Sequence, residues 1–339
     1  MESLPVEMAI SKETILNIGT TDLKIGMFVI LPRKWFRHPF IRNHFKLSST
    51  EEIKKIRNAG IEEVYVDLSK SSIEQEKKIP THVITAPKTK KPEEIVPKEL
   101  INVIRRKDIP AQTRAVAVKK SSLILMNNLL ENPSSENINQ AKQGIYEIVD
   151  FIISDDETSN CLLSITNHDL YTYTHSVNVG FLSLLLAKRL FRGSNLHNLR
   201  ELGASFFLHD LGKVNINSDI INKTAKLNPK ELLLVRQHPT EGAKILEKSH
   251  HLSNEAKIIV MQHHERDDGS GYPNRLKGKQ IHLYARICSI ADVYDALTSE
   301  RSYKKRLLPF NALELMRDEM IHHFQRDLFE QFVLLFAKS

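Results

Sequence analysis

The sequence contains little cysteine and no long apolar run. Its 339 residues include only Cys161 and Cys288, which excludes a disulfide-stapled scaffold and a cysteine-rich zinc ribbon and is typical of a reduced, cytoplasmic protein. No stretch approaches the ~18 uncharged apolar residues that a membrane span needs. Residues 1–20 also lack the charged-then-apolar order of a signal peptide. We therefore expect a cytoplasmic protein without a membrane span.

The composition and charge do not indicate a nucleic-acid polymer as partner. Hydrophobic residues make up 41% of the chain and charged residues 26%, which is ordinary for a soluble globular protein. The net charge of +7 is moderate, and basic residues do not alternate with aromatic ones as they do in grooves that bind single strands. A small phosphate ligand needs only a few of these basic residues.

The first part of the chain predicts a small α+β domain over residues 1–72. A strand is expected over residues 24–31, a helix from Ser49 or Thr50 to about residue 58, and a strand over residues 63–67, where apolar and polar residues alternate. Residues 73–97 contain four prolines and many polar residues, which is typical of a linker.

From residue 98 onward the periodicity is helical nearly to the end. We expect connecting helices over residues 98–149 and an all-α catalytic domain over residues 150–339, so the fold class is mostly α. The segment 112–131 is amphipathic and can serve either as a dimer helix or as a helix that packs within the chain. The expected helices are 112–131, 137–153, 169–192, 198–211, 229–248, 254–265, 282–300 and 309–338.

The second half of the chain also carries five histidines and two aspartates that can bind metal. This set is too large for one ion, which rarely takes more than six ligands and usually keeps some positions for water. It suits two ions about 3.5–4 Å apart that share a carboxylate and bind a phosphate ester. The seven candidate ligands are His175, His209, Asp210, His238, His263, His264 and Asp292.

The position of the aspartates gives the strongest reason for a metal. His209 and Asp210 end the apolar run 204–208, and Asp292 follows the apolar run 287–291. Burying an unpaired carboxylate at such a place costs several kcal/mol, and a bound cation removes that cost. His175 alone would more often be a core histidine, and His238 alone is a weak signal. By contrast, His322 and His323 are expected to lack an acidic partner and to lie on the surface.

The motifs around these residues resemble those of the HD-GYP family, the bacterial branch of the HD phosphohydrolases that hydrolyses cyclic di-GMP. The resemblance covers residues ~150–339, and residues ~18–70 resemble the small domain of unknown function that often precedes such modules. It implies an HD-type helical bundle for the catalytic domain. The matching segments are residues 171–176, 209–213, 237–239, 263–265, 268–273 and 291–298.

The resemblance implies a role for each site residue. His175, His209, Asp210 and Asp292 would hold one ion, and His238, His263 and His264 the second, with Asp210 bridging. Lys213 would contact the scissile phosphate, so Lys213 and Asp210 are the expected catalytic residues. The loop Gly271-Tyr272-Pro273 would line the substrate site, and Arg301 and Lys304 would meet its phosphates.

Two divalent ions are expected, and Fe or Mn fits mixed imidazole and carboxylate ligands better than Mg. Some family members carry a Glu four residues before the first histidine and use it for a third ion. Here that position is Tyr171, which cannot supply a carboxylate. The sequence therefore predicts two ions rather than three.

These features together predict a metal-dependent phosphodiesterase. A hydroxide that bridges the ions would hydrolyse cyclic di-GMP to the linear dinucleotide pGpG, to GMP, or to both. Two alternatives stay open: a non-catalytic metal-containing receptor for cyclic di-GMP, and a phosphohydrolase for another signalling nucleotide. The N-terminal domain shows no ligand site, so a homodimer or a signalling-protein partner is a further expectation.

Overall fold

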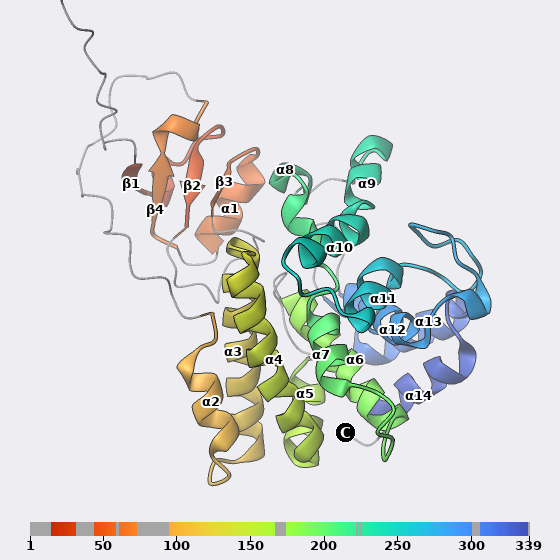
Figure 1. The fold of residues 1–339 in the computed structure, drawn as a ribbon. Helices are drawn as coiled ribbons and strands as arrows, with labels where there is room; N and C mark the ends of the chain where they lie inside the picture. The colour runs from red at the N-terminus through yellow and green to blue at the C-terminus, as the bar shows by residue number, and fades with distance from the viewer. Residues whose placement is uncertain are drawn as a thin grey trace, which may run out of the picture. The chain divides into compact units, whose positions relative to one another are not determined.

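The structure is a computed structural model that describes residues 15–31, 44–58, 61–72, 95–166, 174–221, 223, 226–299 and 306–337. The chain divides into two compact units, residues 1–92 and 93–339, and each is described by itself (Figure 1). Most of the predicted linker lies outside the described residues. The predicted domain boundaries stay predictions.

The N-terminal unit contains a four-stranded antiparallel sheet with the strand order β1-β4-β2-β3. Its strands are β1 (Ile15–Gly19), β2 (Phe28–Ile30), β3 (His44–Lys46) and β4 (Glu63–Asp67), and the helix α1 spans Thr50–Asn58. Val64 and Val66 of β4 are buried, as are Ile53 and Ile56 of α1, so the helix and the sheet share one apolar core. The predicted helix and the strand 63–67 are confirmed, while β2 is shorter than predicted and β1 and β3 were not predicted.

The second unit is helical throughout the part of it that the structure describes, which confirms the predicted fold class. A single hydrophobic core runs from Ile95 to Phe332, so the helices before residue 150 pack with those after it. The helices are α2 (Lys98–Arg105), α3 (Ala111–Glu131), α4 (Ser135–Ser154), α5 (Asp156–Thr166), α6 (Thr174–Leu190), α7 (Leu199–Phe207), α8 (Ser218–Ile221), α9 (Pro229–Val235), α10 (His238–Lys248), α11 (Asn254–Gln262), α12 (Leu283–Thr298), α13 (Pro309–Asp318) and α14 (Arg326–Phe336).

Several predicted helices end earlier or divide, and most of these breaks lie beside a predicted ligand. The helix predicted over residues 198–211 ends at Phe207, and the one over 254–265 ends at Gln262. The segment 229–248 divides into α9 and α10, because Pro239 lacks an N–H and suits only the first turn of a new helix. The segment 309–338 likewise divides into α13 and α14, and α5 was not predicted.

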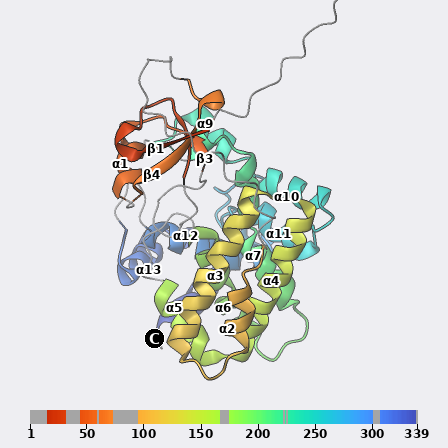
Figure 2. The same cartoon turned by 90° about the vertical axis from the view of Figure 1, so that its left-hand side faces the viewer.

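Helix α3 packs inside the chain. Val118, Leu125 and Leu129 are buried in the core of the second unit, while Val116 on the other face is 51% exposed. Figure 2 shows α3 running alongside α4 and α5. The packing alternative for residues 112–131 is therefore confirmed, whereas self-association of the protein stays a prediction.

Helices α6, α7 and α12 form the centre of the second unit (Figure 1). Helix α6 buries nearly every residue from Ser176 to Ala187, and the Phe181 ring meets the Phe207 ring edge to face at 5.3 Å. Among the described residues, no helix is both long enough and apolar enough to cross a membrane. The buried side chains of these central helices support the candidate site.

A buried ion pair between Asp155 and Arg114 provides a test of how α3 and α5 are held together. The Asp155 carboxylate accepts from Arg114 Nη1 at 2.5 Å and from Thr158 N at 2.8 Å, so it also caps the start of α5. We expect Asp155→Ala to lower the free energy of unfolding by about 2 kcal/mol, because a mostly buried guanidinium loses its partner. Urea unfolding measures this.

The matched control is Asp108→Ala, which removes an equally short pair with Arg106 on the surface. Solvent screens that pair, so its loss should leave the urea midpoint nearly unchanged. Equal midpoints for the two variants would contradict the structural role of Asp155.

Candidate metal centre

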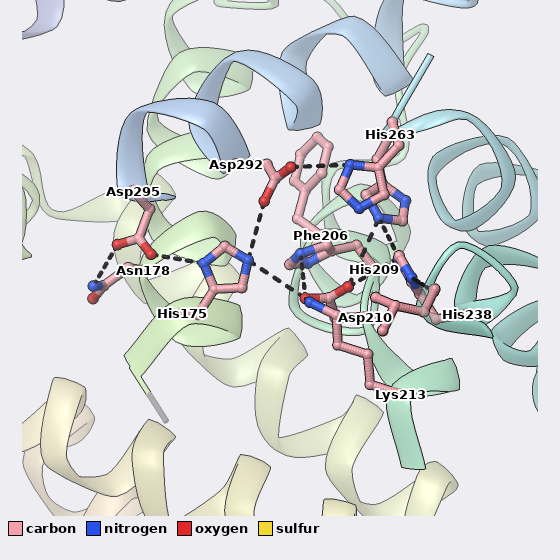
Figure 3. A network of polar contacts seen from close by, with 12 residues as sticks. His175, Asn178, Phe206, His209, Asp210, Lys213, His238, His263, Asp292 and Asp295 are labelled. Atoms are coloured by element: carbon pink, nitrogen blue, oxygen red, sulfur yellow. Dashed lines mark hydrogen bonds and ion pairs between the residues drawn. The ribbon is translucent and has the colours of Figure 1, made fainter. Parts of the chain in front are cut away.

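The structure brings all seven predicted ligands together, six of them at the ends of helices. His175 is the second residue of α6, the pair His209-Asp210 follows α7, His238 begins α10, and His263-His264 follows α11. Asp292 comes from the middle of α12. Figure 3 shows His175 between Asp292 and Asp210, with His209, His238 and His263 on the other side of the Asp210 carboxylate.

Asp210 lies at the centre of the cluster. One oxygen, Oδ1, is 3.2 Å from His238 Nε2 and 3.8 Å from His263 Nε2. The other oxygen, Oδ2, is 3.4 Å from the Nε2 atoms of both His175 and His209. Two donor groups that could each hold an ion therefore share this carboxylate: His175, His209 and Asp210 in one, and Asp210, His238, His263 and His264 in the other.

Three of the imidazoles are oriented by the same kind of contact with a backbone carbonyl. The Nδ1 atoms of His209, His238 and His263 each lie near the backbone carbonyl three residues earlier, at 2.8, 2.8 and 3.0 Å. Each carbonyl belongs to the last turn of the preceding helix, where it has no partner within the helix. Because Nδ1 must carry the proton that it donates, Nε2 is left with a lone pair that faces the cluster.

In the part of the chain that the structure describes, the Nε2 lone pairs have no suitable partner. The Nε2 atoms of His238 and His263 are 3.2 Å apart, and His209 Nε2 is buried without a hydrogen bond among the described residues. Burial lowers the pKa of His238 to about 3 and holds that of His263 well below its usual value, so both imidazoles are neutral. Neutral, facing imidazoles repel unless a cation lies between them, so the donor set fits a metal.

His175 is held from its other side. Its Nδ1 is 2.7 Å from Asp295 Oδ2, and the second oxygen of Asp295 accepts from Asn178 Nδ2 at 2.8 Å. This directs His175 Nε2 toward Asp292 Oδ1, 3.0 Å away. Burial alone would lower the pKa of His175, but its hydrogen bonds with Asp210, Asp292 and Asp295 raise it well above the usual value.

Asp292 links the two donor groups on the side opposite Asp210. Its Oδ2 lies 3.3 Å from His264 Nδ1, while its Oδ1 faces His175. Asp295, one helical turn later, shares this face of α12. Asp295 lies within the matching segment 291–298, but the sequence alone predicts no role for it. Its spacing of three residues from Asp292 was the available signal.

Lys213 lies at the open side of the cluster. Its Nζ is 2.5 Å from Asp210 Oδ2, and its side chain is 30% exposed. Burial would raise the pKa of Asp210, but the charge of Lys213 holds it well below the usual range. The carboxylate is therefore ionised, and Lys213 supplies a positive charge that solvent can reach.

Gly212 lets the segment after α7 pack directly against α10. A Cβ at this position would lie 1.9 Å from the His238 carbonyl oxygen and 2.4 Å from Gly242 N. Only glycine allows this approach of two backbones, and the approach is what brings Asp210 next to His238.

The predicted substrate loop lies against His264. A Cβ at Gly271 would come 2.6 Å from the His264 carbonyl oxygen, which also accepts from Tyr272 N at 3.2 Å. The Tyr272 ring stacks on the His264 ring at 4.7 Å, and Pro273 is exposed. The buried Glu265 carboxylate fixes the rest of the loop by accepting from two backbone N–H groups, those of residues 274 and 276. Sequence reasoning gave Glu265 no such role.

Three residues named from the sequence lie outside the described residues: Arg301, Lys304 and Tyr171. The expectation that His322 and His323 lack an acidic partner is wrong, because Asp268 Oδ2 lies 3.8 Å from His322 Nε2 and 3.9 Å from His323 Nε2. More than 50 residues separate these groups in the sequence, so no local pattern reveals the contact. Since Arg266 Nη1 lies 2.8 Å from His323 Nε2, a cation already occupies this cluster, and we do not assign a metal to it.

Comparison with known proteins shows which families and relatives this chain is similar to. The family model described as a domain of unknown function (DUF3391) matches residues 15–152, and the one described as an HD domain matches residues 162–328. A Pseudomonas aeruginosa protein named cyclic di-GMP phosphodiesterase PA4108 is 33% identical over 325 residues, which cover 94% of this chain and 75% of the relative.

Other relatives match the second half of the chain. A Thermotoga maritima protein named cyclic di-GMP phosphodiesterase is 33% identical over 177 residues, covering 52% of this chain and 45% of that protein. A Vibrio cholerae protein named 3'3'-cGAMP-specific phosphodiesterase 2 is 40% identical over 145 residues, covering 41% of this chain and 28% of that protein. This chain thus spans three quarters of the Pseudomonas relative but less than half of the other two.

A solved structure described as Bd1817, a HDG"Y"P protein from Bdellovibrio bacteriovorus, shares the fold, with a TM-score of 0.59 and 18% identity. The structural match covers 96% of this chain and 100% of the Bdellovibrio chain. A helical unit with a buried cluster of histidines and aspartates is what the HD domain of metal-dependent phosphodiesterases provides. This chain belongs to that HD-domain phosphodiesterase family, with a DUF3391 module before the HD domain, and the resemblance drawn from its motifs is confirmed.

The close approach at Gly212 gives a prediction for the integrity of the centre. We expect Gly212→Ala to separate Asp210 from His238 and to lower metal affinity by on the order of 10–100-fold, since the ligand geometry depends on this contact. Metal titration of the purified variant measures the loss, and circular dichroism reports whether the helices remain. Asn215→Ala, an exposed change in the same turn, is the control. Unchanged metal affinity in Gly212→Ala would refute this role for the glycine.

Proposed function

We propose that the protein hydrolyses cyclic di-GMP to pGpG, to GMP, or to both, at the centre around Asp210. The observation that carries this proposal is the pair of donor groups that share one buried carboxylate, because such a pair suits two ions that bind one phosphate ester. The names of the Pseudomonas and Thermotoga relatives support cyclic di-GMP as the substrate.

The proposed ligands follow the two donor groups. His175, His209, Asp210 and Asp292 would hold one ion, and His238, His263, His264 and the shared Asp210 the other. Asp292 also faces His264, so it belongs near both positions. Imidazole and carboxylate donors without a thiolate favour Fe or Mn. When bound, two such ions would supply an activated water and positive charge for the phosphoryl oxygens.

The protein's own residues would contribute charge and orientation. Lys213 can turn from Asp210 toward a phosphate oxygen, where its ammonium would offset the negative charge that builds during the reaction. Asp295 keeps one proton of His175 on Nδ1, so that Nε2 becomes available when its own proton leaves. Gly271, Tyr272 and Pro273 would line the substrate site, and Arg301 and Lys304 complete the proposed phosphate contacts.

A second candidate substrate is cyclic GMP-AMP. The 3'3'-cGAMP-specific phosphodiesterase of Vibrio cholerae is 40% identical over its matched segment, which is higher than the identity to the Pseudomonas relative. Both cyclic dinucleotides present the same phosphodiester to the centre. Competition between them in a single assay ranks the two substrates.

Removal of Asp210 tests the proposed function. We expect Asp210→Ala to lose bound metal and to lower turnover of cyclic di-GMP by on the order of 10³-fold, because the carboxylate shared by both donor groups is gone. Metal analysis and product chromatography on protein loaded with Fe or Mn measure both effects. Asp150→Ala, which removes a surface carboxylate paired with Arg200, is the control.

Three results would speak against the proposal. An active, metal-replete Asp210→Ala protein would contradict the mechanism. Wild-type protein that binds cyclic di-GMP without cutting it, with either metal, would indicate a receptor. Faster turnover of cyclic GMP-AMP than of cyclic di-GMP would move the assignment to the second substrate.

The protonation of His175 gives a prediction for pH. Since the pKa of His175 is raised in the metal-free protein, its Nε2 carries a proton that a metal has to displace. Metal affinity should therefore rise with pH, by roughly tenfold per unit below that raised pKa if one proton is released. Titration with Mn between about pH 6 and 8 measures this slope. An affinity that does not change over this range would contradict the role of His175 as a ligand.

A further inference from the structure

Arg236 is a basic residue beside the centre that no motif of the sequence singles out. It follows α9 and lies two residues before His238 in the chain. Its Cζ atom lies 5.2 Å from the centroid of the Tyr272 ring, and that ring stacks on His264. The Tyr272 ring therefore contacts both Arg236 and His264, a proposed metal ligand.

The Arg236 guanidinium has an aromatic neighbour but no polar partner among the described residues. Three other exposed arginines, unlike Arg236, are paired with carboxylates: Arg106 with Asp108, Arg200 with Asp150, and Arg317 with Asp318. Arg236 is exposed, and it makes no hydrogen bond or ion pair within the described part of the chain. Its contact with Tyr272 limits the orientations of its plane, while its N–H groups stay open to a ligand.

A cyclic dinucleotide is larger than the phosphodiester that is cut. When one phosphate lies at the Asp210 centre, the bases and the second phosphate must extend over the surrounding surface. The rigid fork of an arginine matches two acceptor atoms in one plane, such as O6 and N7 of guanine or two phosphate oxygens. Arg236 presents such a fork at the edge of the centre, next to the loop that carries Tyr272.

We propose that Arg236 binds the part of the substrate that is not being cut, through two acceptor atoms of a guanine edge or of the second phosphate. This inference rests on the proposed function, since it presumes a cyclic dinucleotide at the centre. Arg236 is then a specificity-determining residue that does not touch the reacting phosphate.

The test compares Arg236→Ala and Arg236→Lys with wild-type protein loaded with Mn. The matched control is Lys230→Ala, which removes the same charge from an exposed position on α9. Turnover is measured with cyclic di-GMP, with cyclic di-AMP, and with bis(p-nitrophenyl) phosphate, a phosphodiester without a nucleobase. The affinity for cyclic di-GMP and the metal content are measured on the same preparations.

We expect Arg236→Ala to lower kcat/KM for cyclic di-GMP by on the order of tenfold or more, as the loss of a two-pronged contact implies. Turnover of bis(p-nitrophenyl) phosphate and the metal content should stay near wild type. The kcat/KM of Arg236→Lys for cyclic di-GMP should lie between the values of Arg236→Ala and wild type, because lysine keeps the charge but not the planar guanidinium. A loss confined to the guanine substrate assigns the contact to the base, whereas an equal loss with cyclic di-AMP assigns it to the second phosphate.

Two results would overturn the inference. One is an Arg236→Ala protein that behaves like Lys230→Ala with every substrate. The other is an equal loss with bis(p-nitrophenyl) phosphate, which would mean that Arg236 acts only by supporting Tyr272 and His264. If wild-type protein cuts bis(p-nitrophenyl) phosphate but not cyclic di-GMP, the proposed function fails by itself. The change in affinity for cyclic di-GMP then decides the role of Arg236.

Discussion

The structure of the centre depends on one electrostatic constraint, the burial of the Asp210 carboxylate among imidazoles whose lone pairs face inward. Asp210 is 5% exposed, and His209, His238 and His263 are fully buried. The Lys213 ammonium offsets the charge of Asp210 at Oδ2, but it does not satisfy the facing Nε2 atoms. Buried polar atoms without partners are costly, so cations bound at the centre would stabilise the cluster.

Helix ends are the means by which the chain builds this cluster. Three histidines each use Nδ1 to satisfy a carbonyl at the end of a helix, which orients the ring and fixes its tautomer in one contact. Asp292 and Asp295 come instead from within α12, one turn apart, and so approach His175 from a single face. The tight backbone approach at Gly212 then sets the spacing between the segment of Asp210 and the helix of His238.

The sequence identified the histidine and aspartate residues of the centre more accurately than it predicted where the helices beside them end. The apolar runs before Asp210 and Asp292 revealed buried carboxylates, and the helical periodicity revealed most of the α-helices. That periodicity continues past Phe207 and Gln262, where the helices end, because the next residues are still apolar or compatible with a helix. Asp295 and Arg236 make contacts across the fold, with His175 on α6 and with Tyr272. The three-residue spacing from Asp292 marks Asp295, whereas no local spacing identifies the contact of Arg236. The same holds for Asp268 and His322.

In the proposed function, seven histidine and aspartate residues, with Asp210 at their centre, form a site for two metal ions. The most direct measurement is the metal content of the full chain, purified without air and equilibrated with Fe or with Mn. We expect about two ions per chain, because two donor groups share one carboxylate, and we expect their loss in Asp210→Ala. A wild-type protein that binds no ion under these conditions would contradict the proposed two-metal site.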